Sequence, residues 1–324
     1  MVLILSLSLA LFAGGIENKV GTTGFQILKI SVGTRGAALG GANVSMPSGP
    51  FSMYWNPAGI CESDNVEVAS FINNWIATIN HGFSGITVPF SKNNYLGIGV
   101  TYMTMDDMEE TTIIQPQGTG RFFSAMDYVA AIAYGHRISD RFASAISVKY
   151  INERIMDIVS DGWAMDVGFT YFYNNLHLGM SFSNFGLNKD ISGTQLQFEY
   201  QIYPEENTDD VLLGFIPKEL VLPMSFRFGA GYNIVKVDNH KLAIMSSLYY
   251  SNDIGQSENI GLEYIFKENY CLRGGYQINH YGFDWSLGGG IKFYIKDLLF
   301  DFGYATVNLQ DFGLRYQSSL AFSF

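Results

Sequence analysis

The sequence is poor in charge, and most of the charge that it carries is negative. Its 324 residues include 19 Lys and Arg against 30 Asp and Glu, a formal net charge of −11. Proteins that bind nucleic acid neutralise its phosphates with basic side chains. We therefore expect no nucleic-acid partner.

Cysteine is also scarce. Cys61 and Cys271 lie far apart in the sequence, and although disulfides form in the cell envelope, the sequence does not decide whether these two pair. Neither follows the N-terminal apolar stretch, which argues against a lipid anchor. Two cysteines and five scattered histidines make no metal-ligand cluster, so we expect no metal and no cofactor.

The third absence is that of a long hydrophobic run. No apolar stretch reaches 18 residues, which excludes membrane-spanning helices. The sequence instead alternates with a period of two, as in residues 283–295, where the odd positions include Phe283, Trp285 and Leu287 and the even ones Asp284 and Ser286. Repeated, aromatic-rich runs of about ten such residues are typical of strands that cross a membrane in a β-barrel.

About fourteen such segments follow one another along the chain. They are residues 65–73, 80–88, 95–105, 124–136, 142–154, 161–172, 176–184, 222–233, 241–251, 257–266, 269–278, 283–295, 298–307 and 312–324. An even number is what a single-chain bacterial barrel with both ends in the periplasm requires. We therefore predict an all-β fold, an antiparallel transmembrane β-barrel of about 14 strands over residues 65–324.

Charged residues within these segments fall on the register opposite the large apolar side chains. A cation near the middle of the lipid face costs about 2–4 kcal/mol, so the charged register must face the lumen. The residues concerned are Lys149, Asp166, Arg227, Glu263, Arg273, Lys292, Asp301 and Arg315.

The connections between segments alternate in length. Short polar turns such as 91–94, 138–141 and 173–175 alternate with connections that include two long ones, 106–121 and 185–222. Outer-membrane barrels have short periplasmic turns and long extracellular loops. This indicates that the chain enters its first strand from the periplasm.

Overall composition agrees with a barrel. The mean hydropathy is +0.10, as expected when lipid-facing and lumen-facing residues alternate, and aromatic residues make up 15% of the chain. An aromatic-rich soluble β-sandwich is the alternative, but its apolar strand faces would need a cover. No linker divides the pattern, so one domain is the simpler interpretation.

The first fifteen residues resemble a signal peptide. An apolar core over residues 2–13 is followed by Gly14 and Gly15, although no basic residue precedes it. We predict that residues 1–15 are removed on export, and that the mature protein lies in the bacterial outer membrane.

Residues 16–64 precede the first strand and are rich in very small residues around a single Arg35. Glycine lets backbones approach closely, and Asn56-Pro57 initiates a turn. The phosphate-binding glycine patterns are missing. We predict a hatch or plug that folds inside the barrel, with Arg35 paired to a luminal carboxylate.

This stretch resembles the opening of the PorV/PorQ family of outer-membrane proteins. The similarity covers residues 24–60 and includes Phe25, Ile27, Leu28 and Ile30, a small-residue run and Trp-Asn-Pro-Ala-Gly. The hatch motif comprises Arg35, Gly36, Gly40, Gly41, Asn56, Pro57 and Ala58. Many relatives carry an acidic pair between the two halves of the motif, whereas residues 46–52 here contain none, so no role of those acids carries over.

The resemblance implies two functions. PorV-like barrels act in type IX secretion, beside a large translocon barrel, and receive cargo through its β-sandwich C-terminal domain. The family is also related to FadL-type fatty-acid transporters, 14-stranded barrels with an N-terminal hatch. In that alternative a hydrophobic small molecule or lipid would occupy the lumen, lined by Phe25, Ile27, Leu28 and Ile30.

The two long loops are the candidate partner-binding surface. The second contains apolar and aromatic residues of the kind found in contact surfaces, Phe198, Tyr200, Tyr203 and Phe215. Alternatively, the loops fold over the barrel mouth as a lid. Acidic residues in them, 106–110 and 205–210, are a candidate calcium site or, as we favour, solvated charges.

The remaining features have a structural interpretation. The luminal charges either line a transport path or, as we favour, form a network that neutralises itself around the plug. Leu320, Phe322 and Phe324 end the chain as a membrane-assembly signal. No nucleophile elbow occurs and the histidines are scattered, so we expect no enzyme; His177 is expected to be an interior polar group.

Overall fold

A computed structural model describes residues 21–188, 191–193, 196–200, 211–214, 221–237, 239–279 and 282–324. Within them the strands of the barrel are β1 (Glu67–Asn74), β2 (Asn80–Ser91), β3 (Asn94–Thr104), β6 (Ala125–Ser139), β7 (Phe142–Ile155), β8 (Ile158–Tyr173), β9 (Leu176–Asn188), β12 (Ser225–Val237), β13 (His240–Ser251), β14 (Gly255–Phe266), β15 (Tyr270–Ile278), β16 (Trp285–Ile295), β17 (Leu298–Asn308) and β18 (Leu314–Ser323). The predicted signal peptide lies outside the described residues.

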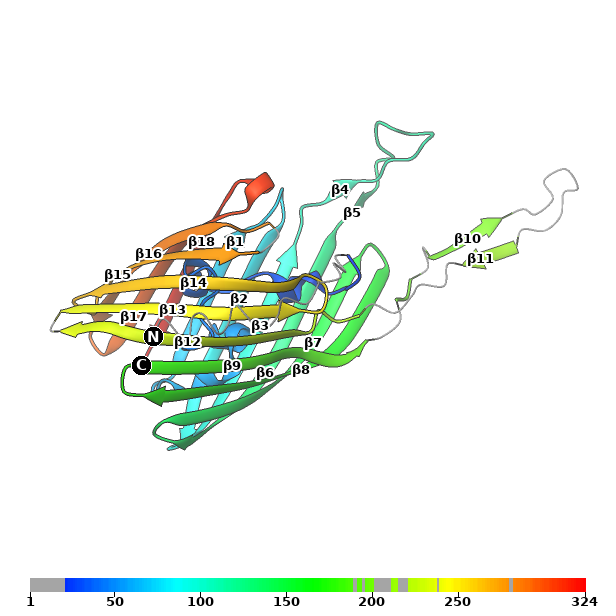
Figure 1. Cartoon of the computed structure of the whole chain (residues 1–324). Helices are drawn as coiled ribbons and strands as arrows, with labels where there is room; N and C mark the ends of the chain where they lie inside the picture. The colour runs from blue at the N-terminus through cyan, green and yellow to red at the C-terminus, as the bar shows by residue number, and fades with distance from the viewer. Residues whose placement is uncertain are drawn as a thin grey trace, which may run out of the picture.

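These strands form a closed antiparallel barrel of fourteen, each paired with its neighbours in the sequence (Figure 1). The first strand closes on the last, with Glu67 opposite Ser323, and Val66 and Phe324 exchange two backbone hydrogen bonds of 3.1 Å. Closure leaves no strand edge in the hydrocarbon, where an unpaired backbone group has no water to bind. The predicted fold and strand number are confirmed.

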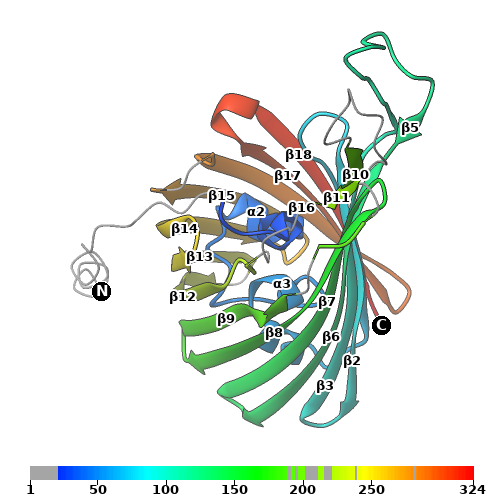
Figure 2. The same ribbon diagram turned by 90° about the vertical axis from the view of Figure 1, so that its right-hand side faces the viewer.

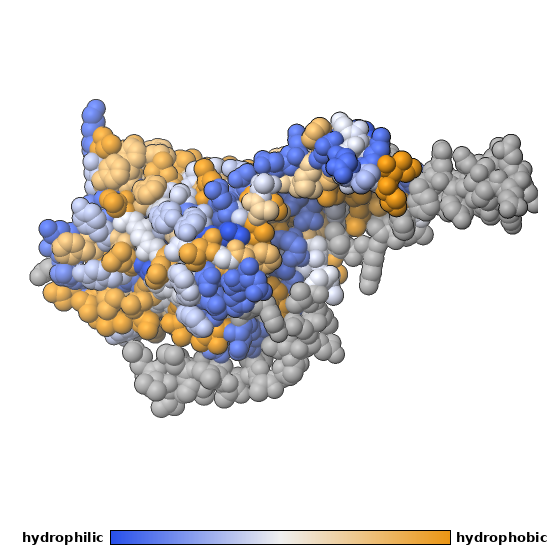
Figure 3. Space-filling model, turned by 90° about the horizontal axis from the view of Figure 1, so that it is seen from above, coloured by the Kyte–Doolittle hydropathy of each residue, from blue (hydrophilic) through white to orange (hydrophobic). Residues whose placement is uncertain are grey.

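The two faces of the strands differ as the alternation predicted. In β16, Ser286 is buried inside the barrel, whereas Trp285, Leu287 and Ile291 on the outer face are 39–53% exposed. Orange apolar areas cover much of the barrel wall in Figure 3. Among the described residues, no helix is long and apolar enough to cross a membrane.

Both long connections leave the same end of the barrel and carry small hairpins (Figure 1). The first pairs β4 (Met108–Glu109) with β5 (Phe122–Phe123), and the second pairs β10 (Gln197–Tyr200) with β11 (Val211–Gly214). By the rule that long loops face outward, this is the extracellular end.

Residues 21–64, which we call the luminal segment, lie within the ring of strands. Its helical turns are η1 (Gln26–Lys29), α2 (Thr34–Ala38), α3 (Ser52–Trp55) and η2 (Pro57–Cys61). Looking down the barrel, α2 and α3 are inside (Figure 2). Contacts of α2 reach β15 to β18, and those of η2 reach β3 and β6 to β8. The segment therefore spans the interior between strands of the first half of the barrel and its last four strands.

Its path runs from one end of the barrel to the other. Near the extracellular end, Thr23 forms a parallel bridge with Val221, which precedes β12. At the periplasmic end, Asp64 binds Arg137, next to the turn between β6 and β7. The chain then turns directly into β1.

Glycines in the wall let the luminal segment approach the strands. A Cβ at Gly179 of β9 would lie 2.0 Å from the Val44 carbonyl oxygen, and one at Gly168 of β8 would lie 2.1 Å from Oδ1 of Asn56. No side chain fits in either space. The close approach of backbone to backbone that we inferred from glycine content thus requires glycine in the wall as well.

We predict that Gly179→Val displaces the luminal segment and lowers the free energy of unfolding by about 1–3 kcal/mol, the usual cost of overpacking. Gly274→Val is the matched control, because a Cβ there meets its nearest atom, on Leu287, at 3.4 Å. Thermal unfolding of both variants in detergent, followed by near-UV circular dichroism, measures the difference. Equal melting temperatures would contradict the predicted packing.

Candidate functional site: the lumen and the extracellular mouth

One glutamate on β14 holds two arginines at the centre of the lumen. Arg35 of α2 donates from Nε and Nη2 to Oε1 and Oε2 of Glu263, each at 2.8 Å, and Arg273 of β15 donates from Nε to Oε1 at 2.7 Å. Arg35 also donates to Oδ1 of Asn43 at 2.9 Å and to the Met46 carbonyl. The predicted pairing of Arg35 with a luminal carboxylate is therefore present, in bidentate geometry.

Most other luminal charges are paired as well. Lys149 lies 2.5 Å from Oδ2 of Asp166, and Lys292 lies 3.2 Å from Asp301. Two further charged residues, which alternation places opposite the large apolar side chains, lie at the rim of the barrel. Arg315 lies at the extracellular rim and binds the carbonyls before it, and Asp284, also at the rim, accepts from Gln310 at 3.0 Å. Arg315 lies in β18 opposite the buried Val307 of β17, so it keeps the inward register, whereas Asp284 comes directly before the first residue of β16.

A bulge separates β9 from β12 near the extracellular end. The register of β8 and β9 shifts between Met165 and Val167, and Asn184 adopts a left-handed φ of 65°. Its backbone N–H donates to Asp166 Oδ1 at 2.8 Å, and its side-chain amide donates to the Pro223 carbonyl at 3.0 Å. Beyond Ser183, the described pairing of β9 is with β8 alone.

Asn56, in the predicted hatch motif, is fully buried and uses its whole amide group. Its Nδ2 donates to the carbonyls of Val44 and Phe169, both at 2.9 Å, while Oδ1 accepts from the Ala58 N–H at 3.2 Å. Pro57 occupies the first turn of η2. The Asn-Pro-Ala sequence therefore caps η2 and ties it to the wall at β8.

The glycines of the motif make close contacts too. A Cβ at Gly36 would lie 2.3 Å from the Trp55 ring, and one at Gly40 would lie 2.8 Å from the Tyr276 nitrogen. At Gly41 the nearest atom, Nδ2 of Asn259, would be 3.0 Å away. All three sit against neighbours that leave no space for a larger residue without movement.

Arg137 fastens the luminal segment at the periplasmic end. It donates to Asp64 at 3.0 Å and to the Cys61 carbonyl, and Tyr95 donates to the same carboxylate at 2.7 Å. Hydrogen bonding from Tyr95, aided by Arg137, lowers the pKa of Asp64.

Cys61 and Cys271 are both free thiols, and burial raises the pKa of Cys61 to about 12, so this thiol stays protonated.

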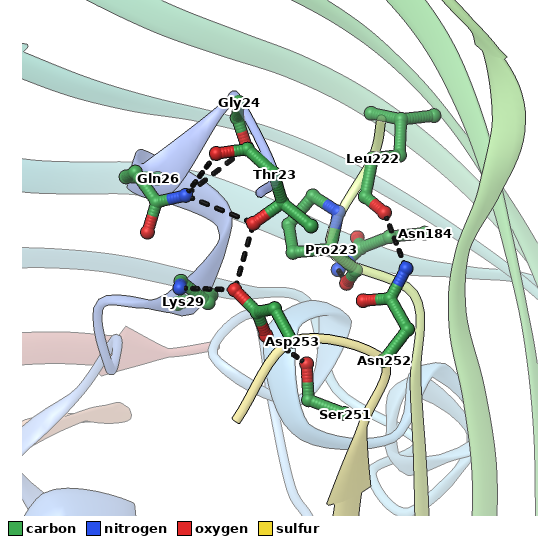
Figure 4. Close-up of polar contacts among 10 residues, drawn as sticks. All are labelled: Thr23, Gly24, Gln26, Lys29, Asn184, Leu222, Pro223, Ser251, Asn252 and Asp253. Carbon is green, nitrogen blue, oxygen red and sulfur yellow. Dashed lines mark hydrogen bonds and ion pairs between the residues drawn. The ribbon is translucent and has the colours of Figure 1, made fainter. Parts of the chain in front are cut away.

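Asp253 is the common acceptor of several hydrogen bonds at the extracellular end (Figure 4). Its carboxylate lies in the turn between β13 and β14, is 1% exposed, and accepts from Lys29 at 2.6 Å, Thr23 at 2.7 Å and Ser251 at 2.6 Å. Next to it, Asn252 donates to the Leu222 carbonyl at 3.0 Å. We call these contacts the extracellular clasp. It joins the luminal segment, the end of the long loop and the barrel wall.

Two cavities lie on opposite sides of the luminal segment, and Trp55 borders both. The periplasmic cavity, about 410 Å³, is lined by polar groups that include Arg35, Glu62, His177 and Glu263. The extracellular cavity, about 340 Å³, is lined by polar residues, among them Arg227, Asn259 and Gln277, and by aromatic and apolar side chains, which include Tyr54, Trp75, Tyr249, Ile254, Phe283 and Val307.

The residues predicted to line a hydrophobic ligand mostly pack into the core instead. Phe25, Ile27 and Leu28 form one cluster with wall residues of β6, β7 and β8, and only Ile30 borders the extracellular cavity. The aromatic residues that line that cavity are scattered between positions 54 and 283 of the sequence, so no local sequence pattern predicted it.

Only some of the residues predicted to bind partners on the second long loop lie in the described part of the chain. Tyr203 and Phe215 lie outside the described residues, as do the acids of 205–210, while Phe198 and Tyr200 belong to β10. In the first loop, Ile113 and Ile114 are 102% and 92% exposed at the tip. We call residues 105–124 the extracellular arm.

The remaining predicted groups are placed as follows. In the arm, Glu110 pairs with Arg121 at 2.7 Å, and the part of the chain that the structure describes contains no group of three potential metal ligands. His177 lies 3.1 Å from the Asn233 amide. At the end of the chain, Leu320 and Phe324 are exposed, and Phe322 packs edge-on against Phe300 at 5.0 Å. Their role in assembly stays a prediction.

Comparison with known proteins identifies the family. The model of the family described as "Type IX secretion system protein PorV" matches residues 14–250. No curated protein matches the sequence closely enough to count as a relative.

Solved structures show the same fold at low identity. The CymD monoaromatic hydrocarbon channel has a TM-score of 0.60 and 13% identity, over 90% of this chain and 96% of that one. The Pseudomonas putida toluene transporter TodX has a TM-score of 0.61 and 12% identity, over 91% and 98%. The Ralstonia pickettii toluene transporter TbuX has a TM-score of 0.58 and 11% identity, over 90% and 97%.

A closed 14-stranded barrel with these features is an outer-membrane protein of the FadL-like fold. The chain belongs to the PorV family of the type IX secretion system, as the resemblance in residues 24–60 implied. It is therefore an outer-membrane barrel of that secretion system, from a family of secretion and transport components rather than enzymes.

We predict that Arg35→Ala lowers the free energy of unfolding by about 3 kcal/mol, because it leaves Glu263 with one arginine and empties the centre of the lumen. Melting temperature in detergent is the measurement. Arg121→Ala, which removes a largely exposed arginine from the arm, is the control and should leave the melting temperature unchanged. An unchanged melting temperature for Arg35→Ala would rule out this role.

The clasp should be sensitive to acid. Burial raises the pKa of Asp253, but hydrogen bonds from Lys29, Ser251 and Thr23 outweigh it and lower the pKa below the usual value of about 3.9. A lowered folded-state pKa gives stability that is fully present above the unfolded-state pKa of about 3.9 and is lost as the pH falls from there through the lower folded-state pKa.

We therefore expect the melting temperature to fall between pH 5 and pH 3 by more in the unmodified protein than in Asp253→Asn. At pH 7, Asp253→Asn itself should cost of the order of 3 kcal/mol, since Lys29 loses its partner. Asp311→Asn, in the β17–β18 connection, is the control. Parallel melting curves against pH for the unmodified protein and Asp253→Asn would show that the carboxylate does not act as described.

Proposed function

We propose that this barrel binds its protein partners at the extracellular end, through the extracellular arm, and passes secreted cargo on without conducting its folded domain through the lumen. The partners are the type IX translocon barrel and the β-sandwich C-terminal domains of cargo. The observation that supports this most is the exposed pair Ile113 and Ile114 at the tip of the arm. An apolar pair held in water away from the barrel is typical of a contact surface.

The geometry of the arm supports a β-type contact. Strands β4 and β5 pair only with each other among the described residues, so each has a free edge. A free edge is a template for an incoming strand, and cargo domains rich in β-structure supply such strands.

The filled lumen supports the second half of the proposal. Residues 21–64 cross the barrel, and the cavities on either side measure about 340 and 410 Å³, the size of small-molecule sites. A folded domain has no path through such an interior. Cargo therefore meets this protein at its outer surface.

Transport of hydrophobic small molecules is the alternative. The aromatic wall of the extracellular cavity favours it, and the solved structures of the same fold include a monoaromatic hydrocarbon channel and toluene transporters. In this case a ligand that moves from one cavity to the other would pass Trp55, which borders both.

We predict that the double variant Ile113→Ser with Ile114→Ser reduces recovery of the translocon barrel and cargo at least tenfold when the protein is extracted from its native membrane. Both side chains are fully exposed, so the melting temperature should not change. Mass spectrometry of bound proteins and bound lipids is the readout.

Phe312→Ser is the matched control, because Phe312 is a 56% exposed aromatic at the same end of the barrel but outside the arm. Undiminished recovery of both partners by the double variant would contradict the role of the arm. Recovery of hydrophobic small molecules alone, from the unmodified protein, would favour transport.

A further inference from the structure

Arg227, on the inner face of β12, is a buried cation held by aromatic rings. Its side chain is 6% exposed, and its guanidinium carbon lies 4.6 Å from the ring centre of Tyr249, 5.4 Å from Tyr54 and 5.7 Å from Trp55. Among the residues that the structure describes, no carboxylate lies within ion-pair distance of it.

The other deeply placed cations differ in this respect. Arg35 and Arg273 share Glu263, Lys149 pairs with Asp166, and Lys29 pairs with Asp253. Stacking on aromatic rings recovers about 2 kcal/mol for a desolvated cation, less than the several kcal/mol that burying an ion costs. Arg227 thus retains an unsatisfied preference for an anion.

This cation lies in the wall of the extracellular cavity. The cavity opens between connections at the extracellular end, since Ile79, Ile254 and Phe283 border it together with Arg227. Its volume of about 340 Å³ fits a small molecule or a few residues of a chain. An anion arriving from outside can therefore reach the arginine.

Two further groups in the same cavity lack partners. Oδ1 of Asn259 and Oε1 of Gln277 are buried oxygens without a hydrogen-bond donor, and both residues line the cavity. A buried acceptor without a donor costs about 1–3 kcal/mol. A ligand that brings N–H groups would satisfy them, which a simple hydrocarbon or fatty acid does not.

From these observations we infer that the extracellular cavity is a binding site for a carboxylate borne by an apolar, amide-containing group, such as the C-terminal end of a polypeptide or a free N-acyl amino acid. The carboxylate binds Arg227, amide N–H groups donate to Asn259 and Gln277, and apolar side chains contact Trp75 and Phe283. This goes beyond the proposed function, because the arm and the cavity are separate surfaces.

The test uses the full-length protein in detergent and the dipeptide N-acetyl-Leu-Phe, as the free acid and as its C-terminal amide. Trp55 and Trp75 line the cavity, so tryptophan fluorescence reports binding. We expect the acid to bind saturably and at least tenfold more tightly than the amide. Equal binding of acid and amide by the unmodified protein would overturn the proposal without any variant.

Variants then assign the contact. Arg227→Gln should remove the preference for the acid, whereas Arg315→Gln, an arginine at the same end that lies outside the cavity, should retain it. If Arg227→Gln does not fold, the comparison of acid with amide in the unmodified protein still decides. Retention of the preference in a folded Arg227→Gln would overturn the site.

Two further probes separate the possible ligands. Decanoate has the carboxylate and an apolar body but no amide, and binding as tight as that of the dipeptide acid would overturn the role of Asn259 and Gln277. The same Leu-Phe terminus displayed at the end of a folded domain tests a polypeptide source. Binding of both forms, or of the free dipeptide alone, supports the site and identifies which source it accepts. None of these outcomes depends on the arm, so failure here and failure of the proposed function are distinguishable.

Discussion

Closure of the barrel by backbone pairing between its first and last strands is the constraint on which the rest of this structure depends. A strand that crosses a bilayer must pair on both sides, and the pairing of β1 with β18 completes that requirement. A ring of fourteen strands encloses more space than its own luminal side chains fill, so the interior needs another occupant. The luminal segment supplies it, and the charges, glycines and cavities described above are arranged around it.

The charged groups of this interior are of two kinds: those held in ion pairs, and Arg227, which is held by aromatic rings. Around Glu263, Arg35 and Arg273 share one carboxylate, so each of the two cations has an anionic partner. At the extracellular end, Asp253 is likewise satisfied, but Arg227 faces a cavity and its guanidinium lies over aromatic rings. A single barrel therefore combines an ion-paired cluster around Glu263, which holds the segment in place, with one cation, Arg227, that faces a cavity without a carboxylate partner among the described residues.

The fold could be predicted almost entirely from the sequence, because a period of two between lipid and lumen is imposed on every strand. Strand number, pairing of neighbours and the inward position of Lys149 and Glu263 all follow from it. The sites could not be predicted in the same way. The cage around Arg227 joins residues 54, 55 and 249, and the clasp joins residues 23 and 253, so only the folded chain brings them together. The family resemblance located the hatch motif but not what each residue contacts.

The path of the luminal segment has a consequence for how the barrel assembles. Thr34 binds Ser319, 285 residues later in the chain, and Ala38 accepts a hydrogen bond from Ser286. A slip of one residue in strand pairing turns every inward side chain outward, so Ser286 and Ser319 would then face lipid and neither contact could form. The segment that is synthesised first can therefore form these hydrogen bonds only when the strands that are synthesised last pair in the correct register. Correct register of the last strands is thus a condition for fastening the luminal segment at Thr34 and Ala38.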